Sequence, residues 1–472
     1  MLMMDQVCKF TASTLLALSL SACMITDIPE VADSDVPDAW QGPLIDDAQI
    51  WPDNEWWQSF NNEELNTLII QVQENNLDLA NNQRNLELAQ LNLREAGFNL
   101  LPIPVVNVGT GAIYSDSSAS GSSTPSVPLE LSAGFTYNDI LSKPSTYNKA
   151  QAEYDSRVAQ VADTALNTLG TASSTYFQLL LIRDRIEASI QNVENAEEIG
   201  KIAQARVEAG MVVEIESLQQ QIAIDRERAN LESLKQTDLS ARASLALLLG
   251  RSVQGFDVSG QTLQNIDVPT VQPGLPSELL RRRPDLVQAE ASLRGATANV
   301  DLVRTNFFPQ ISLTGSASAS STSLSELVSS PDSVLNISAN LVQTLLDNGQ
   351  RFRNMDQAKL NMESSLASYR KVVISAFNDI EVQLSNIEVL EKLGLVAFKN
   401  LGAAEESFRI AQLRYEEGVA DYQTALIAQN TLFTTRNSYL DNKLLQLNAI
   451  VGLYQSLGGG WKAGEEIYQE EN

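Results

Sequence analysis

The pattern of hydrophobic and polar positions predicts β-strands in two separate parts of the chain. Apolar residues alternate with small polar ones through most of these parts, a period of two that is typical of strands with one buried face. The segments concerned are 104–114, 127–137, 311–320 and 335–341. Serine-rich stretches at 115–126 and 320–333 separate the members of each pair. The sequence therefore predicts two β-hairpins, at about 104–137 and 310–342.

These predicted strands have one apolar face and one small, polar face. Each is about 10 residues long, the length that spans a bilayer when a strand is tilted. A barrel with lipid outside and water inside shows this pattern, although a soluble sheet shows the same alternation. Four strands cannot close a wide barrel, and lipid does not tolerate open edges. Strands that cross a membrane would therefore have to be pooled by several chains.

Long helices are predicted after each hairpin. Residues 147–209 contain no proline, and small or apolar residues recur there at a spacing close to 3.5. The positions are Val158, Ala162, Ala165, Leu169, Ala172, Tyr176 and Leu179. In the second half, the equivalent positions are Val373, Phe377, Ile380, Leu384 and Ile387. This period predicts nearly parallel helices with a coiled-coil seam, and sixty such residues would extend roughly 90 Å.

Each long helix reaches a glycine, Gly210 or Gly418, and the helical pattern then resumes at 218–249 and 424–457. A shorter helix precedes each hairpin, at about 63–99 in the first half and 284–306 in the second. Pro284 suits the first position of a helix, where its missing N–H has no intrahelical partner to lose.

The two halves of the chain are copies of one unit. Residues 203–210 read Ala-Gln-Ala-Arg-Val-Glu-Ala-Gly, and 411–418 read Ala-Gln-Leu-Arg-Tyr-Glu-Glu-Gly. Asp78-Leu79 likewise recurs as Asp285-Leu286. We therefore divide the chain into repeat 1, at 61–257, and repeat 2, at 270–457, with a C-terminal tail at 458–472. A tandem duplication favours a ring, a barrel or a solenoid, but a solenoid needs about three or more repeats.

Composition excludes several classes of function. The net charge of −27 argues against a nucleic-acid partner, which requires a basic surface. The chain has no histidine, so it lacks the usual general base and the commonest metal ligand. No phosphate-binding loop, dinucleotide fingerprint or metal-ligand cluster occurs in the sequence. We predict neither enzymatic activity nor a cofactor or metal.

The N-terminus resembles a bacterial lipoprotein signal. An apolar stretch at 10–22 ends Leu20-Ser21-Ala22-Cys23, and a small-residue cleavage site after such a stretch indicates secretion. The resemblance implies that 1–22 are removed and that Cys23 is lipidated. Met24, after the cysteine, points to the outer membrane. The alternative is an ordinary signal peptide with an incidental cysteine. No later segment has 18 apolar residues in a row, so we expect no transmembrane helix after the signal.

An acidic, proline-containing stretch follows at 23–60, and we interpret it as an extended segment leaving the lipid anchor. Its aromatic cluster consists of Trp51, Trp56, Trp57 and Phe60. We expect these side chains to pack the segment onto the body of the protein. Tryptophans at a membrane interface are the alternative.

Several motifs together resemble the TolC-like outer membrane factor family, in the lipoprotein branch that serves RND multidrug efflux pumps. The longest is Leu275-Pro-Ser-Glu-Leu-Leu-Arg-Arg-Arg-Pro-Asp-Leu-Val-Gln-Ala-Glu290. The others are Phe307-Phe308-Pro309, Ile311-Ser-Leu-Thr-Gly315, Leu346-Asp-Asn-Gly-Gln-Arg351 and Arg414-Tyr-Glu-Glu-Gly-Val419. The resemblance covers nearly all of 50–457, and its motifs are specific in combination rather than singly. The usual motif after the second strand is missing from repeat 1, at 138–145, so the strand-to-helix join is expected to differ there.

The resemblance implies an α+β membrane protein that forms a homotrimeric channel-tunnel. Four strands from each of three chains would form a 12-stranded outer-membrane β-barrel, which continues into a long periplasmic α-helical barrel. It implies an outer membrane exit duct of a tripartite efflux pump, whose partners are a periplasmic adaptor, an inner-membrane RND pump and outer membrane lipid. An alternative with the same fold is the outer membrane channel of a type I protein secretion system. A purely structural coiled-coil lipoprotein would explain the helices and the anchor but not the strands.

The family contacts its adaptor at the helix-tip turns, which here are Gly210, Met211, Val212, Gly418, Val419 and Ala420. The glycines also suit a left-handed helix end without any partner. Relatives often place aspartates just past the second tip, at the periplasmic aperture, and the position that aligns here is Ile427. The remaining candidates for the aperture are Glu214, Glu216, Asp421, Arg206 and Arg414. Solvated surface charges are the alternative for each of them.

Overall fold

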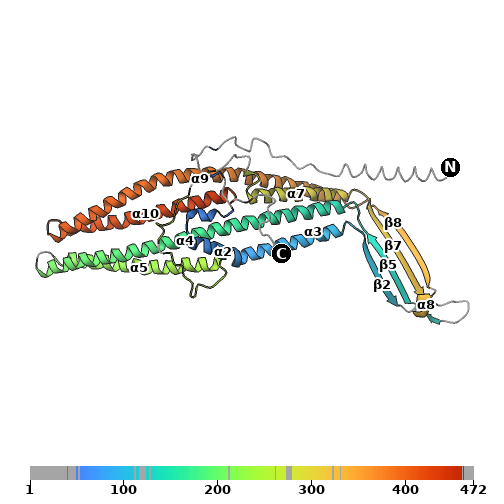
Figure 1. Cartoon of the computed structure of the whole chain (residues 1–472). Helices are drawn as coiled ribbons and strands as arrows, with labels where there is room; N and C mark the ends of the chain where they lie inside the picture. Colours follow the sequence, from blue (N-terminus) through green and yellow to red (C-terminus); the bar gives the residue numbers. More distant parts are fainter. Residues whose placement is uncertain are drawn as a thin grey trace. The chain divides into compact units, whose positions relative to one another are not determined.

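The computed structural model describes residues 40, 49–50, 54–110, 113–115, 124–126, 129–210, 213–260, 262–269, 271–272, 279–321, 324–329, 331–459 and 461 (Figure 1). The chain divides into two compact units. The sheet unit contains Asn85–Val158 and Gln288–Arg370, and the helical unit contains Ala32–Arg84, Ala159–Val287 and Lys371–Asn472. Each unit is described by itself. The predicted signal peptide, Cys23 and nearly all of the tail lie outside the described residues.

The sheet unit holds a four-stranded antiparallel sheet. Its strands are β2 (Ile103–Thr110), β5 (Leu129–Tyr137), β7 (Gln310–Ser321) and β8 (Asp332–Val342), in the order β2-β5-β7-β8. The two predicted hairpins are present and pair with each other through β5 and β7. The short strands β3 (Ile113–Ser115) and β4 (Thr124–Ser126) pair near the first serine-rich tip. The second serine-rich stretch contains a short helix, α8 (Leu324–Ser329), that we did not predict.

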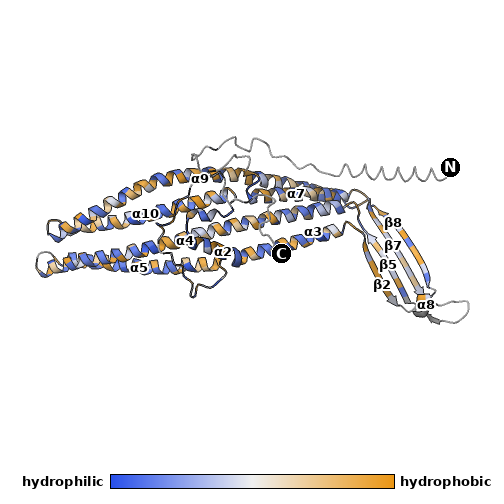
Figure 2. Cartoon of the chain, viewed as in Figure 1, coloured by the Kyte–Doolittle hydropathy of each residue, from blue (hydrophilic) through white to orange (hydrophobic). Residues whose placement is uncertain are grey.

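The register of the sheet sorts its residues onto two faces. On one face, one cross-strand row consists of Pro104, Phe135, Gly315 and Ile337, and the next row on that face consists of Val106, Ala133, Ala317 and Leu335. The row between these two belongs to the other face and consists of small polar or apolar residues, Val105, Gly134, Ser316 and Asn336. One face is therefore mainly apolar and the other mainly small and polar, as the alternation predicts. Figure 2 shows hydrophobic residues recurring along the four strands.

Both outer strands of the sheet lack a partner on one side among the described residues. There β2 pairs only with β5 and β8 only with β7, and every residue of β2 and β8 is exposed. Pro104 lies in an edge strand, where a residue without an N–H is tolerated. At the centre, Gly134 leaves no room for a side chain, because a Cβ there would lie 2.5 Å from the Gly315 carbonyl oxygen. The sheet thus ends in two open edges within a single chain.

The two strand-to-helix joins differ, as expected from the missing motif. In the second join Asn348 and Gly349 both have positive φ, and Asp347 accepts a bond from the Gly349 amide at 3.1 Å. The first join has a single left-handed residue, Asp139, and α4 (Lys143–Glu208) begins shortly after it.

Two long helical hairpins dominate the chain, and their distal parts lie in the helical unit. In the first, α4 is followed by α5 (Ile215–Leu248). In the second, α9 (Gln350–Glu416) is followed by α10 (Tyr422–Ser456). The predicted seam positions Ala162, Leu169, Ala172, Tyr176 and Leu179 are buried, and so are Val373, Phe377, Ile380 and Leu384. No helix in the described residues is both long and apolar enough to cross a membrane.

The predicted helix at 63–99 is wrong as a single element. It is two helices, α2 (Glu63–Asn75) and α3 (Leu77–Phe98), separated by an extended residue, Asn76. The Asn76 side chain accepts hydrogen bonds from the Asp78 and Leu79 amides at 2.9 and 3.0 Å and so caps α3. Its amide nitrogen also donates to the Leu248 carbonyl at 2.9 Å. The break therefore ties α3 to the end of α5. In the second half, α7 (Pro284–Thr305) begins at the predicted proline.

The segment before α2 packs onto the helical unit through its aromatic residues. Trp56, Trp57 and Phe60 lie in a short 3₁₀ helix, η2 (Trp56–Phe60), and all three are buried. Trp56 stacks on Tyr454 with 5.1 Å between ring centroids. Ahead of them, β1 (Gln49–Ile50) pairs in parallel with β6 (Val271–Gln272). The packing interpretation of this cluster is confirmed for the three residues, while Trp51 lies outside the described residues.

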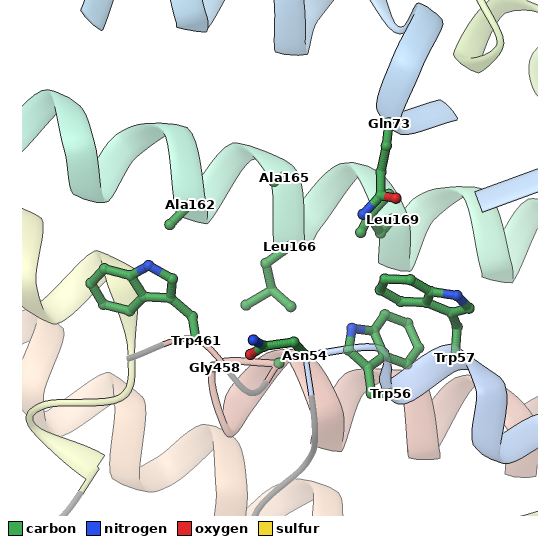
Figure 3. Close-up of a pocket in the computed structure, with 11 residues that line it drawn as sticks. Asn54, Trp56, Trp57, Gln73, Ala162, Ala165, Leu166, Leu169, Gly458 and Trp461 are labelled. Atoms are coloured by element: carbon green, nitrogen blue, oxygen red, sulfur yellow. The ribbon is translucent and has the colours of Figure 1, made fainter. Parts of the chain in front are cut away.

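A cavity of about 180 Å³ lies beside this cluster (Figure 3). The indole rings of Trp56, Trp57 and Trp461 surround it together with Leu166 and Leu169 of α4. The lining is mostly apolar, so the cavity belongs to the packing of η2 and the end of α10 against α4.

Candidate functional site

The tip turns are built on glycines in the left-handed conformation. Gly210 has φ of 69° and Gly418 has φ of 72°, values that favour glycine. After Gly418, the amides of Val419 and Ala420 both donate to the Arg414 carbonyl, at 2.8 and 3.0 Å, and so close the end of α9. The Val419 side chain is 76% exposed. Met211 and Val212 of the first tip lie outside the described residues.

A buried aromatic pair lies directly beneath the second tip. Tyr415 and Tyr422 are buried, and their rings meet edge to face with 6.1 Å between centroids. They belong to a core formed by α4, α9 and α10. Its other members are Ile199, Ala404, Phe408, Ala411, Ala425, Ala428, Leu432 and Phe433. The tip turn is therefore held by packed side chains close below it.

A buried amide joins this core to the first helical hairpin. Gln220 of α5 is fully buried, and it accepts a hydrogen bond from the Tyr422 hydroxyl at 2.7 Å. Its amide nitrogen donates to the Ala196 carbonyl of α4 at 2.6 Å. The contact thus links α4, α5 and α10. We did not predict these residues as part of the site; a glutamine at an otherwise apolar seam position was the only signal available.

Two of the predicted aperture residues, Arg206 and Glu216, act on Tyr415. The Arg206 guanidinium lies 4.9 Å from the centroid of the Tyr415 ring, and an Arg206 N–H donates to the Tyr415 carbonyl at 3.4 Å. Burial and the Glu216 carboxylate raise the pKa of Tyr415, while Arg206 opposes them. Burial, Tyr415 and Glu216 raise the pKa of Tyr422 to about 12. Both phenols therefore stay neutral at physiological pH and act as hydrogen-bonding and packing groups.

The other predicted aperture residues do not join this cluster. Asp421 caps α10, accepting from the Thr424 amide at 2.8 Å and from its hydroxyl at 2.6 Å, and these bonds lower the pKa of the Asp421 carboxyl. Glu214 and Arg414 are exposed. Ile427 is 56% exposed on α10. The structure thus gives Asp421 a capping contact.

We expect Gln220→Leu to loosen the tip. The substitution leaves the Tyr422 hydroxyl without its acceptor, at a cost of about 1–3 kcal/mol, and removes the bond from α5 to the Ala196 carbonyl of α4. Amide hydrogen exchange in 196–202 and 420–425 should become faster. Gln221→Leu is the matched control, because Gln221 is exposed and bonds only to Asp225. Equal exchange rates in the two variants would contradict a tethering role for Gln220.

Arg283 forms a cluster of hydrogen bonds at the C-terminal end of α10, opposite the tip. Arg283 donates to both oxygens of Asp285, at 3.0 and 2.7 Å, and to Asp379 of α9 at 3.2 Å. It also reaches the Ser456 carbonyl at the end of α10, at 3.4 Å. Only 9% of Arg283 is exposed. The Arg283-Pro284-Asp285 motif is therefore a connection between the start of α7, α9 and the end of α10.

No group of three or more His, Cys, Asp or Glu side chains in the described residues is placed to hold a metal ion. The features that the described residues do form are an amphipathic sheet with open edges and two long helical hairpins, the second of which ends in the turn at Gly418.

The model of the outer membrane efflux protein family matches the chain twice, at 68–251 and at 275–459. The chain belongs to the outer membrane efflux protein family. Its members are efflux proteins rather than enzymes. The two matches cover most of the chain, and each contains one of the two hairpins together with the long helices that follow it.

Relatives within the family align over nearly their whole length. The pyoverdine export outer membrane protein OpmQ of Pseudomonas aeruginosa is 28% identical over 95% of this chain and 96% of its own. The outer membrane protein OprJ of the same species is 26% identical over 97% of both. The cation efflux system protein CusC of Escherichia coli O157:H7 is 25% identical over 94% of this chain and 97% of its own.

Solved outer membrane channels share the fold. The Campylobacter jejuni CmeC channel superimposes with a TM-score of 0.84 at 22% identity, covering 93% of this chain and 95% of that one. The open state of the Neisseria gonorrhoeae MtrE channel gives 0.78 at 25% identity, over 93% and 99%. The predicted fold class is confirmed by these neighbours.

Proposed function

We propose that the chain is the outer membrane exit duct of a tripartite efflux pump, passing drugs or other small molecules from an inner-membrane RND transporter and a periplasmic adaptor to the outside. The observation that carries the proposal is the amphipathic four-stranded sheet, open at both edges, in a chain of the outer membrane efflux protein family. The relatives OpmQ, OprJ and CusC are named as outer membrane or efflux components.

The open edges support a trimer. In lipid, each unpaired N–H and C=O of β2 and β8 costs free energy, because no water is present to replace the missing bond. Pairing β8 of one copy with β2 of the next removes both edges, and a closed ring is the usual way for identical chains to achieve this. Three copies with four strands each would give the twelve-stranded barrel expected from the resemblance.

The tips support docking of a periplasmic adaptor. The second turn carries the exposed Val419 beside the left-handed Gly418, and Gly210, at the end of the first long helix, is likewise left-handed and exposed. The buried Tyr415, Tyr422 and Gln220 cluster would transmit a change at the second tip to α4 and α5, since it bonds or packs against both hairpins. Tip docking and this linkage are consistent with an aperture whose opening is controlled by the adaptor.

Dye accumulation tests the function. Cells in which the gene is deleted should accumulate a fluorescent efflux substrate faster, and the intact gene should restore the original rate. No change, with the protein detected in the outer membrane of the restored strain, would contradict an efflux duct. The secreted proteome of the same strains would then decide whether the channel exports proteins by a type I system.

Lipidation at Cys23 has its own test. We expect Cys23→Ser to remove palmitate labelling and to leave a precursor with altered electrophoretic mobility that is less efficiently targeted to the outer membrane. The expectation rests on the Leu20-Ser21-Ala22-Cys23 sequence, and acyl chains would add membrane affinity to that of the strands. Cys8→Ser is the control, because this cysteine would leave with the signal peptide. Unchanged labelling and mobility in Cys23→Ser would exclude lipidation.

A further inference from the structure

A polar cavity lies between the two helical hairpins, away from the tips. Its volume is about 220 Å³, and one face of each of three helices lines it. The α4 face presents Arg185, Ala188, Ser189 and Asn192, spaced three and four apart, and the α10 face presents Phe433, Arg436 and Asn437. Asn230 and Leu234 of α5 complete the lining. These helices appear in Figure 1 as α4, α5 and α10.

Polar atoms in this lining lack hydrogen-bond partners. In the part of the chain that the structure describes, the Ser189 hydroxyl, the Asn192 side-chain oxygen and the Arg185 Nε are buried without one. Ser189 is 1% exposed and Asn192 is 5% exposed. A buried polar atom left unpaired costs about 1–3 kcal/mol. Three such atoms beside one cavity indicate a polar occupant.

The charge of the lining selects the kind of occupant. Two guanidinium groups, Arg185 and Arg436, line the cavity, and no carboxylate does among its lining residues. Their acidic partners lie toward solvent: Arg185 pairs with Asp441, which is 46% exposed, and Arg436 pairs with Glu405, which is 52% exposed. In a chain with 59 acidic and 32 basic residues, such a lining is unusual.

The available donors match an oxyanion. Arg185 has an unpaired Nε–H, and the Ser189 hydroxyl can donate. The unpaired atom of Asn192 is its side-chain oxygen, which accepts and therefore suits a water or an O–H group of the ion. Charge-assisted bonds from guanidinium to oxyanions are among the strongest in proteins. A volume of about 220 Å³ holds one such ion with several waters, each of which occupies about 30 Å³.

We propose that the cavity between α4, α5 and α10 binds one small oxyanion per chain, either inorganic phosphate or sulfate, or the carboxylate of a small organic acid. The site would bridge the two hairpins, because its donors come from α4 on one side and α10 on the other. The inference is independent of the efflux function, since it rests only on the lining of the cavity.

Equilibrium dialysis of the purified full-length protein, assembled in detergent, tests the site. Radiolabelled phosphate, sulfate and acetate are used separately at fixed ionic strength, held by a buffer and salt that contain no oxyanion. We expect saturable binding of one ion per chain for at least one probe. Binding of phosphate or sulfate without acetate identifies an inorganic ion, and binding of acetate alone identifies a carboxylate.

Two variants locate the ion. Arg436→Gln and Ser189→Ala should each weaken binding about tenfold, the effect of losing one good hydrogen bond. Ser189→Ala keeps the test usable if Arg436→Gln fails to fold. The matched controls are Arg228→Gln, whose guanidinium pairs with Glu197 at the surface, and Ser233→Ala at an exposed position of α5. Absence of saturable binding, or equal binding in all four variants, would mean that the cavity holds water only and would overturn the proposal.

Discussion

Gly418→Pro is expected to abolish export while leaving the assembled protein in the outer membrane. Proline fixes φ near −65° and has no N–H, whereas Gly418 has φ of 72° and donates to the Tyr415 carbonyl at 3.1 Å. The substitution therefore reshapes the turn and displaces the exposed Val419. A Cβ at Gly418 has nothing within 4 Å, so the change should not disturb packing elsewhere. Dye accumulation should rise to the level of the deletion strain.

Gly418→Asn is the matched control for this experiment. Asparagine adopts the left-handed region more readily than other non-glycine residues, and it keeps the N–H, so most export should remain. The amount of trimer in isolated membranes must be measured for both variants. Loss of trimer together with activity in Gly418→Pro would assign the glycine to folding, and full activity would exclude a role for the tip.

Arg283→Met is expected to have the second large effect, a loss of folded protein. Removing one partner from a buried ion pair costs about 3–5 kcal/mol, because the remaining charges stay buried. The lower end applies here, since Asp379 is 46% exposed and solvent screens it. Asp285, at the start of α7, would lose the guanidinium group that donates to both of its carboxylate oxygens. We expect a lower yield of trimer and a lower temperature of heat dissociation.

Acidic pH should partly rescue the same variant. Burial and the nearby Asp285 raise the pKa of Asp163, and Arg283 lowers it, so removing Arg283 raises the pKa of Asp163 further. A folded state whose carboxyl pKa is raised binds more protons than the unfolded state, so its stability increases as pH falls. The dissociation temperature of Arg283→Met should therefore rise, relative to wild type, as pH falls through the raised pKa of Asp163 toward the ordinary value of 3.8.

The control for Arg283 is Arg409→Met. Arg409 is exposed and pairs only with Glu406, one turn away on the same helix, so its loss should be nearly neutral. If Arg283→Met and Arg409→Met dissociate at the same temperature at every pH, the cluster does not hold α7, α9 and α10 together.

The sequence was informative where a period extends over many residues. The seam through Ala162, Leu169 and Tyr176 reflects burial of one helix face, and these residues are buried in the structure. The alternation in the strands correctly predicts the two faces of the sheet, although every residue of β2 and β8 is exposed in the single chain. The break at Asn76 was missed because the helical pattern continues on both sides of it. The cap that the Asn76 side chain forms on α3 and its contact with the Leu248 carbonyl, far along the chain, favour an extended residue there.

The site was harder to predict than the fold for the same reason. The glycines at the tips have a local signature, since a left-handed residue ends each helix. The roles of Gln220 and Tyr422 arise from a contact between α5 and α10 that no local pattern encodes. Asp421 is predicted at the aperture from its charge and its place just past the second tip, and that role stays a prediction. The structure adds that Asp421 caps α10 through Thr424.

The two open sheet edges have a genetic consequence. If every β8 must pair with the β2 of a neighbour, one defective edge leaves the ring of strands unpaired at one junction. When wild-type and edge-defective copies are made in equal amounts and mix at random, only about one trimer in eight contains no defective copy. Edge mutations in β2 or β8 should therefore be dominant over the wild-type allele, whereas substitutions that prevent a chain from joining any ring should be recessive.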